Sequence, residues 1–468
     1  MKKQTHLIHK KSLFIFRRDL RYDDNTGLRL ALEQSESVVT AFIIDPVQVG
    51  KSNIYKSNAA LQFMTQALGE LAKTLKNKNG KLYFFIGSPE TIVKKLSKQE
   101  NFSAIYVNRD YTPYSLKRDA QIATICKKLE IAFHACSDIL LQEPENMAKK
   151  SGGFYSVFTP FYKAFMQKTI QKPVYTKLHN FYTKPIMGAC LDLISSGLGS
   201  EISFVPNKKI TVSGSRVACL KILDMLERFK NYDRQRDFPE LDATTHLSAY
   251  LKFGVCSIRE VYHAIVQELG KKHTLVKQLC WRDFFTHIAY NNPQIFGAPF
   301  REKYKKLRWN NNQKNFELWC TGNTGFPVVD AGMRELVATG LMHNRVRMLT
   351  ASFLVKDLHI DWRDGERFFA THLVDYDPSV NNGNWQWVAS TGCDAQPYFR
   401  IFNPWLQQKK YDKDGVYIKR WIPELTDVPT KDIHNWYKTY QKYKNVYVRP
   451  MVEHEHERLV TKQIFARV

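Results

Sequence analysis

The stretch SLFIFRRDLRYDDNTGLRLALEQSESVVTAFII, residues 12–44, holds two apolar runs on either side of a helical pattern. Residues 12–16 and 38–44 are short and rich in strand-forming side chains, and residues 25–34 between them have the spacing of a helix. A strand, a helix and another strand in succession predict the start of a parallel sheet.

The same alternation continues to about residue 140. Strand-like runs follow at 81–86, 104–107 and 131–134, and helical patterns at 58–75, 89–97 and 116–129. Such alternation is typical of a parallel sheet with helices on both faces. Residues 1–140 are therefore predicted to form a Rossmann-like α/β domain.

Beyond residue 140 the strand-like runs nearly vanish. Residues 141–212 are irregular and contain many Pro and Gly residues, which predicts a long connector with short helices such as 157–169. Helical patterns then recur at 215–229, 247–253, 257–269, 274–291, 327–339, 342–356 and 363–372. All nine tryptophans lie at or beyond residue 281. The predicted fold is thus an α/β domain, a connector and an all-helical domain over residues 213–468.

The composition narrows the class of protein. The 468 residues carry 69 Lys and Arg against 45 Asp and Glu, a net charge of +24 that favours polyanions, with nucleic acid first and an anionic membrane surface second. A hydrophobic content of 44% excludes a disordered chain, and no apolar run is long enough for a transmembrane helix or a signal peptide. The eight cysteines form no Cys-x-x-Cys pair, so we expect them to be reduced and mostly buried, in a cytoplasmic protein.

A predicted helix over residues 273–291 carries an unusual polar face. Gln278, Trp281, Arg282 and Phe285 fall three or four residues apart, on one side of the helix. A ligand-binding face is one interpretation. The alternative is a core indole next to an ion-paired arginine.

A second segment, residues 341–357, combines polar side chains with an apolar helix. Asn344, Arg347 and Met348 share a face, and Arg345 points elsewhere. Two arginines and an amide are costly to bury without partners. The segment predicts either a polar binding surface or a solvated helix start.

Two further segments are rich in hydrogen-bonding groups. Residues 374–393 read as a Gly-bearing loop, and a polar ligand or a solvated turn would explain its side chains Asp375, Asp377, Asn381, Asn382, Trp385 and Trp387. At the start of the helix near 247 stand Thr244, Thr245 and Ser248, which suit either a phosphate or an ordinary cap. Together these segments predict an anionic aromatic cofactor. No spacing of His or Cys supports a metal site, and we expect none.

Seven motifs spread over the chain are recognisable together: FRRDLRYDDN (16–25), YDRQRDFP (232–239), TTHLS (244–248), WRDFF (281–285), TGFPVVDAGMREL (324–336), MHNRVRMLTASFLVKDLHIDWR (342–363) and NNGNWQWVASTGCDAQPYFRIFNP (381–404). With them the chain resembles the DNA photolyase/cryptochrome family from end to end, most closely its class I cyclobutane pyrimidine dimer photolyases. The resemblance implies an antenna domain, a connector and a helical FAD domain. It also implies light-driven electron donation from reduced FAD to a pyrimidine dimer flipped out of UV-damaged DNA.

The resemblance implies a role for each matching residue. The positions that match FAD contacts are Tyr232, Thr244, Thr245, Leu247, Ser248, Gln278, Arg282, Asn344, Arg347, Asp375, Asp377 and Asn381. Among them, Arg347 and Asp375 match an ion pair against the flavin ring, Asp377 an adenine- or ribose-side contact, and Asn381 the residue facing flavin N5. The positions that match catalytic residues at the dimer or the flavin are Gln278, Asn344, Met348 and Asn381.

Other positions match contacts to DNA or an electron path. Trp281 and Trp387 match the two indoles that cradle the flipped dimer. The matches to further dimer or backbone contacts are Arg236, Arg345 and Arg400. The matches to a tryptophan chain that relays electrons from the surface to the flavin are Trp309, Trp362 and Trp385.

Three departures from the family pattern bear on function. Gln278 stands where dimer photolyases usually carry Glu, and Gln there resembles (6-4) photolyases and animal cryptochromes. However, Asn344 and Met348 occupy the positions of the (6-4) enzymes' histidine pair, which argues against that chemistry. His246 replaces a common Arg in the phosphate-binding stretch. Tyr114-Ser115 replaces an Asn-Glu pair of folate-using relatives, so a methenyl-folate, a deazaflavin or no antenna stays open.

The leading hypothesis is repair of cyclobutane pyrimidine dimers, and the alternative is a blue-light-sensing cryptochrome. The chain ends soon after the family region, whereas signalling members usually carry a C-terminal extension. The resemblance also suggests a monomer, and no obligate protein partner is evident.

Overall fold

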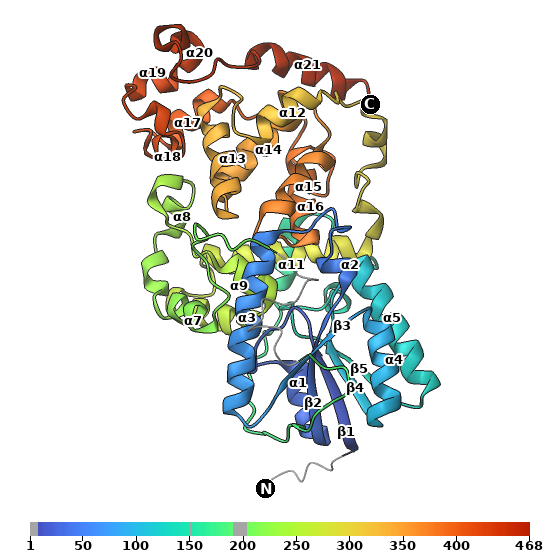
Figure 1. Cartoon of the computed structure of the whole chain (residues 1–468). Helices are drawn as coiled ribbons and strands as arrows, with labels where there is room; N and C mark the ends of the chain where they lie inside the picture. The colour runs from blue at the N-terminus through green and yellow to red at the C-terminus, as the bar shows by residue number, and fades with distance from the viewer. Residues whose placement is uncertain (1–7, 150, 191–203) are drawn as a thin grey trace.

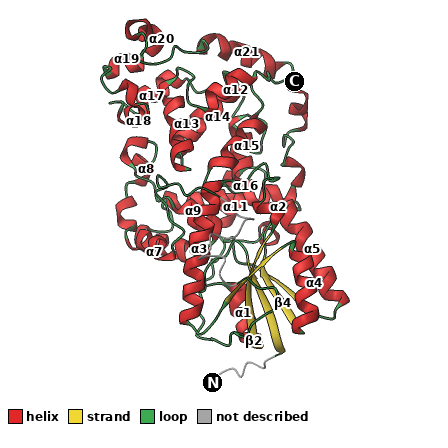
Figure 2. Ribbon diagram, in the orientation of Figure 1, coloured by secondary structure: helices red, strands yellow, loops and turns green. Residues whose placement is uncertain are grey.

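The fold begins with a five-stranded parallel sheet. The computed structural model describes residues 8–149, 151–190 and 204–468 (Figure 1). The strands, yellow in Figure 2, run in the order β3-β2-β1-β4-β5, and every neighbouring pair is parallel. Their bounds are β1 (His9–Phe16), β2 (Ser35–Ile44), β3 (Leu82–Ile86), β4 (Ala104–Asn108) and β5 (Ala132–Cys136). All five overlap the runs predicted to be strands.

Helices cover both faces of the sheet, as predicted. On one face lie α1 (Thr26–Gln34) and α3 (Asn58–Asn77), and on the other α4 (Pro89–Glu100) and α5 (Pro113–Lys128). Side chains of a strand alternate between the two faces. In β1, Phe14 and Phe16 accordingly pack with α1 and α3, whereas Leu13 and Ile15 pack with α4 and α5.

The rest of the chain is helical. After the short α2 (Pro46–Val49) in the first domain, the remaining α-helices are α6 (Phe158–Phe165), α7 (Arg216–Asp224), α8 (Tyr232–Gln235), α9 (Leu247–Phe253), α10 (Ile258–Leu269), α11 (Thr274–Asn291), α12 (Gln313–Cys320), α13 (Pro327–Thr339), α14 (Asn344–Lys356), α15 (Trp362–His372), α16 (Pro378–Val388), α17 (Pro404–Tyr411), α18 (Val416–Trp421), α19 (Thr430–His434), α20 (Trp436–Thr439) and α21 (His454–Ala466). Short 3-10 helices are η1 (Pro144–Met147), η2 (Leu226–Phe229), η3 (Pro239–Leu241), η4 (Pro293–Ile295), η5 (Glu302–Lys306), η6 (Pro423–Leu425) and η7 (Tyr440–Tyr443). Within the described ranges no helix is both long and apolar enough to cross a membrane.

Helix α16 corrects one expectation, because its residues were predicted to form a loop. Asp377 caps the helix by accepting the backbone N–H of Ser379 at 3.0 Å, and Pro378 occupies the first turn. The amide of Gln386 donates to the carbonyls of Ile295 (3.2 Å) and Ala298 (3.1 Å) in a neighbouring loop. Tertiary contacts therefore hold as a helix a segment whose Asn and Gly content disfavours one.

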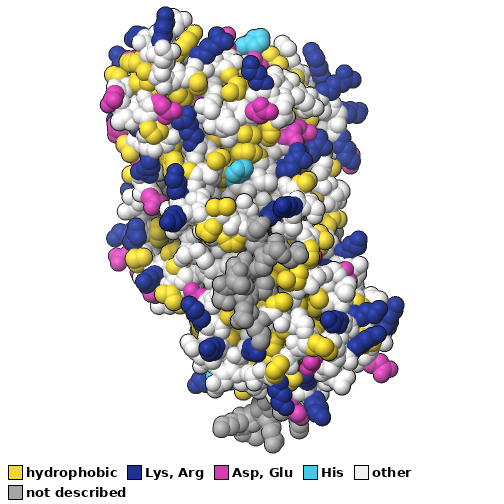
Figure 3. Space-filling view, viewed as in Figure 1, with side chains coloured by type: hydrophobic (Ala, Val, Ile, Leu, Met, Phe, Trp, Pro, Cys, Tyr) yellow, Lys and Arg dark blue, Asp and Glu magenta, His cyan; other side chains and the backbone are white. Residues whose placement is uncertain are grey.

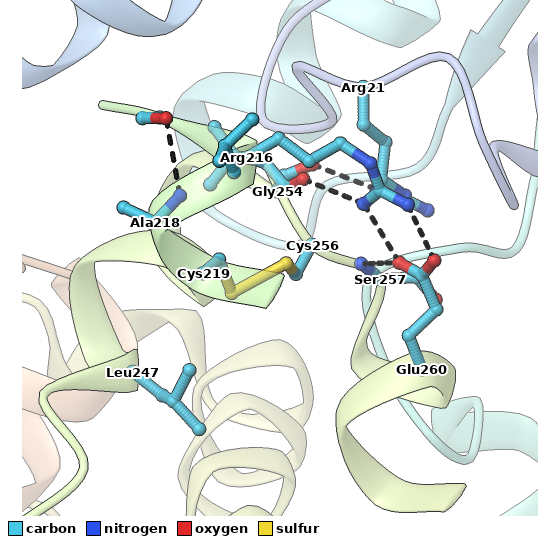
Figure 4. Close-up of a disulfide and its surroundings, with 12 residues drawn as sticks. Arg21, Arg216, Ala218, Cys219, Leu247, Gly254, Cys256, Ser257 and Glu260 are labelled. Atoms are coloured by element: carbon cyan, nitrogen blue, oxygen red, sulfur yellow. Dashed lines mark hydrogen bonds and ion pairs between the residues drawn. A yellow bond between two sulfur atoms is a disulfide. The ribbon is translucent and has the colours of Figure 1, made fainter. Parts of the chain in front are cut away.

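The cysteines correct a second expectation, that all are reduced. Cys219 on α7 forms a disulfide with Cys256, which lies just before α10, across a sequence separation of 37 (Figure 4). Both residues are buried. The pairing depends on how α7 packs beside the start of α10, where Arg216 of α7 also pairs with Glu260 at 2.6 Å. Spacing along the chain carries no signal for it.

Buried ion pairs dock the sheet domain onto the helical domain. Arg18 follows β1 and forms ion pairs with Asp110, which follows β4, at 3.2 Å and with Asp377 at the start of α16. Nearby, Arg259 of α10 bonds Asp24 and Asp138 of the first domain, both at 2.9 Å. The docking point lies at the carboxyl ends of β1 and β4, where the strand order reverses and α/β sheets usually bind their ligands.

Candidate functional site

The helical domain contains a cavity of about 1260 Å³. Segments from the end of the connector to α18 line it, and they contribute eight Lys and Arg side chains against four Asp and Glu. Seventeen of the residues singled out from the sequence are among its lining: Tyr232, Arg236, Thr244, Thr245, Leu247, Ser248, Gln278, Trp281, Arg282, Asn344, Arg347, Met348, Asp375, Asp377, Asn381, Trp385 and Trp387. Through these residues the fold gathers five of the seven motifs around one space.

Four other candidates do not line this cavity. Arg345 turns away from its neighbours on α14, as the helical spacing predicts; its guanidinium pairs with Asp237 at 2.8 Å and lies 4.4 Å from the ring centre of Tyr411. Arg400 is exposed. Trp309 and Trp362 line a separate, smaller cavity.

Helix α11 presents the predicted face to the cavity. Gln278, Trp281 and Arg282 all line it, and the indole of Trp281 stacks on Phe158 with ring centres 3.6 Å apart. This stacking supports one face of the indole from behind. Arg282 is fixed by donating to the carbonyl of Ile139 at 2.7 Å.

The neighbour of Arg282 was missed by the sequence reasoning. Asp283 is fully buried and accepts the backbone N–H groups of Leu141 (2.8 Å) and Gln142 (3.3 Å). Burial raises the pKa of Asp283 to about 7. The residue ties the connector to α11 behind the cavity. In the sequence, the signal for a special role of Asp283 was a carboxylate placed among the aromatic side chains of the motif WRDFF.

The start of α9 forms another wall of the cavity. His246 immediately precedes the helix in a left-handed conformation with φ of 52°, and its side chain contacts Asp242 at 2.7 Å instead of capping the helix. Thr245 accepts the N–H of Leu247 only at 3.4 Å. The first turn of the helix therefore retains donor capacity toward the cavity.

Helices α14 and α16 supply the charged and amide groups. The guanidinium of Arg347 donates to the carbonyl of Met342 at 2.8 Å and to Asp375 at 3.0 Å, which fixes it at the cavity wall. The amide of Asn381 donates at 3.1 Å to both the backbone carbonyl and the carboxyl oxygen of Glu366. Burial raises the pKa of Glu366 to about 7, against the opposing effect of this hydrogen bond.

Glu366 and Trp319 are two further residues that the sequence reasoning missed. Glu366 lies on the buried side of α15, and an acid among apolar neighbours such as Trp362 and Phe369 was its signal. Trp319 is fully buried on α12, and its ring centre lies 6.3 Å from that of Trp385. Nothing in its local sequence distinguishes it from an ordinary core indole.

Two family models of known proteins match the chain. Residues 12–177 match the family model for DNA photolyase, and residues 275–467 match the model for the FAD binding domain of DNA photolyase. A protein of Alkalihalophilus pseudofirmus named deoxyribodipyrimidine photo-lyase is 37% identical over 95% of both chains. The crystal structure of an archaeal photolyase from Sulfolobus tokodaii with two FAD molecules is 40% identical, with a TM-score of 0.87 over 98% of this chain and 100% of that one.

A relative with another name has the same fold. The crystal structure of a Synechocystis cryptochrome is 29% identical, with a TM-score of 0.87 over 97% of this chain and 99% of that one. Sequence motifs, the two-domain fold and the FAD-binding domain agree over nearly the full length, and the chain belongs to the DNA photolyase family.

Proposed function

We propose that the protein repairs cyclobutane pyrimidine dimers in UV-damaged DNA by light-driven electron transfer from reduced FAD. The observation that carries this proposal is that one cavity is lined both by the residues matching flavin contacts and by Trp281 and Trp387, the indoles matching the dimer cradle. Its volume of about 1260 Å³ exceeds the roughly 300–1,000 Å³ of ordinary ligand pockets, which favours two occupants side by side.

The cavity residues fit FAD. The lining carries a net excess of four basic side chains, which suits a diphosphate, and the start of α9 has donor capacity for its oxygens. Arg347 and Asp375 would hold the flavin ring from one side. The NH2 group of Asn381 donates to Glu366, so its amide oxygen would accept from the N5–H of the reduced flavin. When bound, the cofactor supplies the electron that opens the dimer.

The chain's own residues would hold the dimer. Trp281, supported from behind by Phe158, would stack on one flipped base, and Trp387 would close the other side. Gln278 would accept a hydrogen bond from a base N3–H and donate one to O4 through its amide. Positioning by these groups brings the dimer next to the flavin site.

Repair by chemically reduced protein tests the proposal. An oligonucleotide with one thymine dimer is illuminated with the protein under exclusion of oxygen, and the loss of dimers is followed by chromatography. We expect light-dependent loss, and about tenfold weaker dimer binding for Trp281→Ala, because one base-stacking surface is removed. Intact FAD binding without any repair would refute the proposal.

A blue-light-sensing cryptochrome is the second candidate. It is favoured by Gln278 in place of the usual Glu and by the fold shared with the Synechocystis cryptochrome. A (6-4) photolyase is a weaker candidate, because Asn344 and Met348 replace the histidine pair. The same experiment is repeated with an oligonucleotide that contains a (6-4) product. A light sensor would repair neither the thymine dimer nor the (6-4) product.

The proposal extends to the first domain and to the setting of the reaction. We assign residues 1–140 to an antenna domain, 141–212 to the connector and 213–468 to the catalytic domain. An antenna pigment, if the domain binds one, would be a methenyl-folate or a deazaflavin, and the two FAD molecules of the Sulfolobus tokodaii photolyase add a flavin to this choice. Absorbance of chromophores extracted from the purified protein decides between them. We further propose a cytoplasmic monomer that acts on DNA without an obligate protein partner.

A further inference from the structure

A second cavity lies beside two of the tryptophans that match the electron relay. It measures about 220 Å³, and its lining includes Trp309, Trp362, Lys305 and Arg363. Trp362 is 1% exposed, whereas Trp309 is only partly buried. A molecule in this cavity would therefore lie against the two relay indoles that do not line the large cavity.

The surroundings of this cavity are basic. Residues 301–309, REKYKKLRW, carry five Lys and Arg against one Glu. Lys305 contacts Glu302 at 2.8 Å, and Arg363 pairs with Asp361 and donates to the carbonyl of Gly297 at 3.1 Å. An ammonium has three donors and a guanidinium five, so both side chains keep N–H groups for another acceptor.

The two indoles that line the cavity each carry an Nε1–H group. Within the described part of the chain, neither Trp309 nor Trp362 donates its Nε1–H to a protein acceptor, whereas the buried indole of Trp319 donates to the carbonyl of Thr350 at 3.0 Å. A small cavity with two cationic side chains and redox-active rings suits an anion that can exchange electrons.

We propose that this cavity binds a small anionic one-electron donor of the enediolate class, which reduces Trp309 after Trp309 has given an electron to the relay. The inference rests on the proposed function, because the relay role of Trp309 comes with it. A volume of 220 Å³ lies below the range of drug-sized pockets and suits a molecule of about a dozen non-hydrogen atoms.

Reduction of the Trp309 radical by the bound donor balances in electrons, protons and charge. Light drives an electron from Trp385 to the flavin site, and electrons from Trp362 and then Trp309 refill the relay, which leaves a Trp309 radical cation. The bound enediolate monoanion loses one electron to Trp309 and one proton to water. The products are neutral Trp309 and the radical anion of the donor, so charge is conserved.

Binding in the dark tests the site without any photochemistry. Ascorbate is the probe, added to the FAD-loaded protein in a buffer without phosphate, and saturation-transfer NMR measures its affinity. We expect saturable binding that Lys305→Gln weakens about fivefold through the loss of one ion contact. Lys306→Gln is the matched control, because Lys306 carries the same charge in the same exposed segment but does not line the cavity. No dark binding, or equal effects of the two variants, would overturn the proposal.

Flash photolysis tests the electron transfer. The decay rate of the tryptophan radical should level off with rising ascorbate and stay linear with neutral dithiothreitol, which only collides with the surface. A decay rate of the tryptophan radical that rises linearly with ascorbate concentration would contradict a binding site in this cavity. Repair by chemically pre-reduced protein needs no relay, so loss of repair in that assay counts against the proposed function and not against this cavity.

Discussion

At the scale of single residues, the pair Glu366 and Asn381 links stability to pH. Burial raises the pKa of Glu366 from 4.5 to about 7, so between these values the folded protein binds a proton that the unfolded chain releases. The free energy of unfolding must then fall as pH rises through this window. We expect Glu366→Gln, which stays neutral and can still accept from Asn381, to be more stable than the wild type at pH 8 by up to about 3 kcal/mol.

Melting temperatures at pH 5 and pH 8 check this prediction. At pH 5 the two proteins should differ little, because Glu366 is then already protonated. Glu317→Gln removes the same charge from an exposed position on α12 and should show no such pH-dependent difference. A Glu366→Gln variant that is less stable than the wild type at pH 8 would show that the carboxylate is ionised and well paired.

If Arg345 binds DNA as proposed, its ion pair with Asp237 opposes that contact. The carboxylate holds the guanidinium at 2.8 Å, and the ring of Tyr411 stacks against it. A DNA phosphate that uses Arg345 must therefore compete with Asp237. We expect Asp237→Asn to bind undamaged DNA about fivefold more tightly and to steepen the slope of log K against log salt by about 0.9, the change for one additional phosphate contact.

A salt titration of DNA affinity measures both effects of this substitution. Asp233→Asn on α8 makes the same charge change nearby and serves as the control. If both variants tighten binding equally, net charge accounts for the result and Asp237 has no specific hold on Arg345.

At the scale of elements, Gly365 lets α15 and α16 approach each other closely. A Cβ added at this position would lie 2.2 Å from a ring carbon of Trp385 and 2.5 Å from a methyl group of Leu354. Alanine normally favours a helix over glycine, but overpacking a buried contact costs about 1–3 kcal/mol. We expect Gly365→Ala to lower the melting temperature and to weaken FAD binding, because Trp385 lines the large cavity proposed to hold FAD.

A double-mutant cycle checks that Trp385 is the cause. Phenylalanine lacks the outer ring carbons that the new methyl group would meet, so Gly365→Ala in a Trp385→Phe background should cost less than in the wild type. Strictly additive losses of stability would place the strain elsewhere.

The elements also show how far the sequence predicts this structure. Periodicity located the sheet strands and helices such as α11, α13 and α14, because an apolar pattern and the face it buries have the same period. It failed for α16, where Gly383 and the Asn residues form a helix only because Phe285 and the loop near Ile295 pack against them. The lining face of α11 was predictable from spacing, but the contact of Asn381 with Glu366 joins two helices and has no local signal.

The disulfide between α7 and the start of α10 carries a stability prediction of its own. Closing a loop of this length stabilises a protein by about 4 kcal/mol in the chain-entropy model. We expect a variant with both Cys219→Ser and Cys256→Ser to melt at a lower temperature, and reducing agent to lower the wild-type value but not that of the variant. Thiol alkylation of the unreduced, denatured protein should label the other six cysteines; eight labelled thiols would contradict the pairing.

At the scale of the whole molecule, charge acts in two different ways. Basic side chains lie over both the sheet domain and the helical domain on the face shown in Figure 3, which suits long-range attraction of DNA. Buried charges act locally and hold the two domains together. Arg18 joins the end of β1 to the start of α16 through its ion pair with Asp377. Burial opposes ionisation of Asp377, but the charge of Arg18 outweighs burial and holds the pKa of Asp377 well below its ordinary value.

Removal of Arg18 should therefore uncouple the domains. Arg18→Met leaves Asp110 and Asp377 buried without their shared partner, which typically costs about 3–5 kcal/mol. Burial also opposes ionisation of Asp110, yet Arg18 and the other basic neighbours of Asp110 lower its pKa to about 2. The ion pair between Arg18 and Asp110 therefore stabilises the fold above pH 3.8, and this stabilisation is lost as pH falls toward 2. The difference in stability between wild type and variant should be largest at pH 7 and should narrow below pH 4.

Calorimetry of the holoprotein gives the clearest readout, because a docked pair of domains melts together and an uncoupled pair melts in two steps. Arg17→Met is the matched control: Arg17 is the adjacent residue, and it pairs with Asp119 inside the sheet domain. Arg17→Met should lower the temperature of the single transition without adding a second one. If Arg18→Met kept a single transition at the wild-type temperature, the domains would be held together by their apolar contacts. The ion pairs at the carboxyl end of the sheet would then serve only to orient Asp377 at the large cavity.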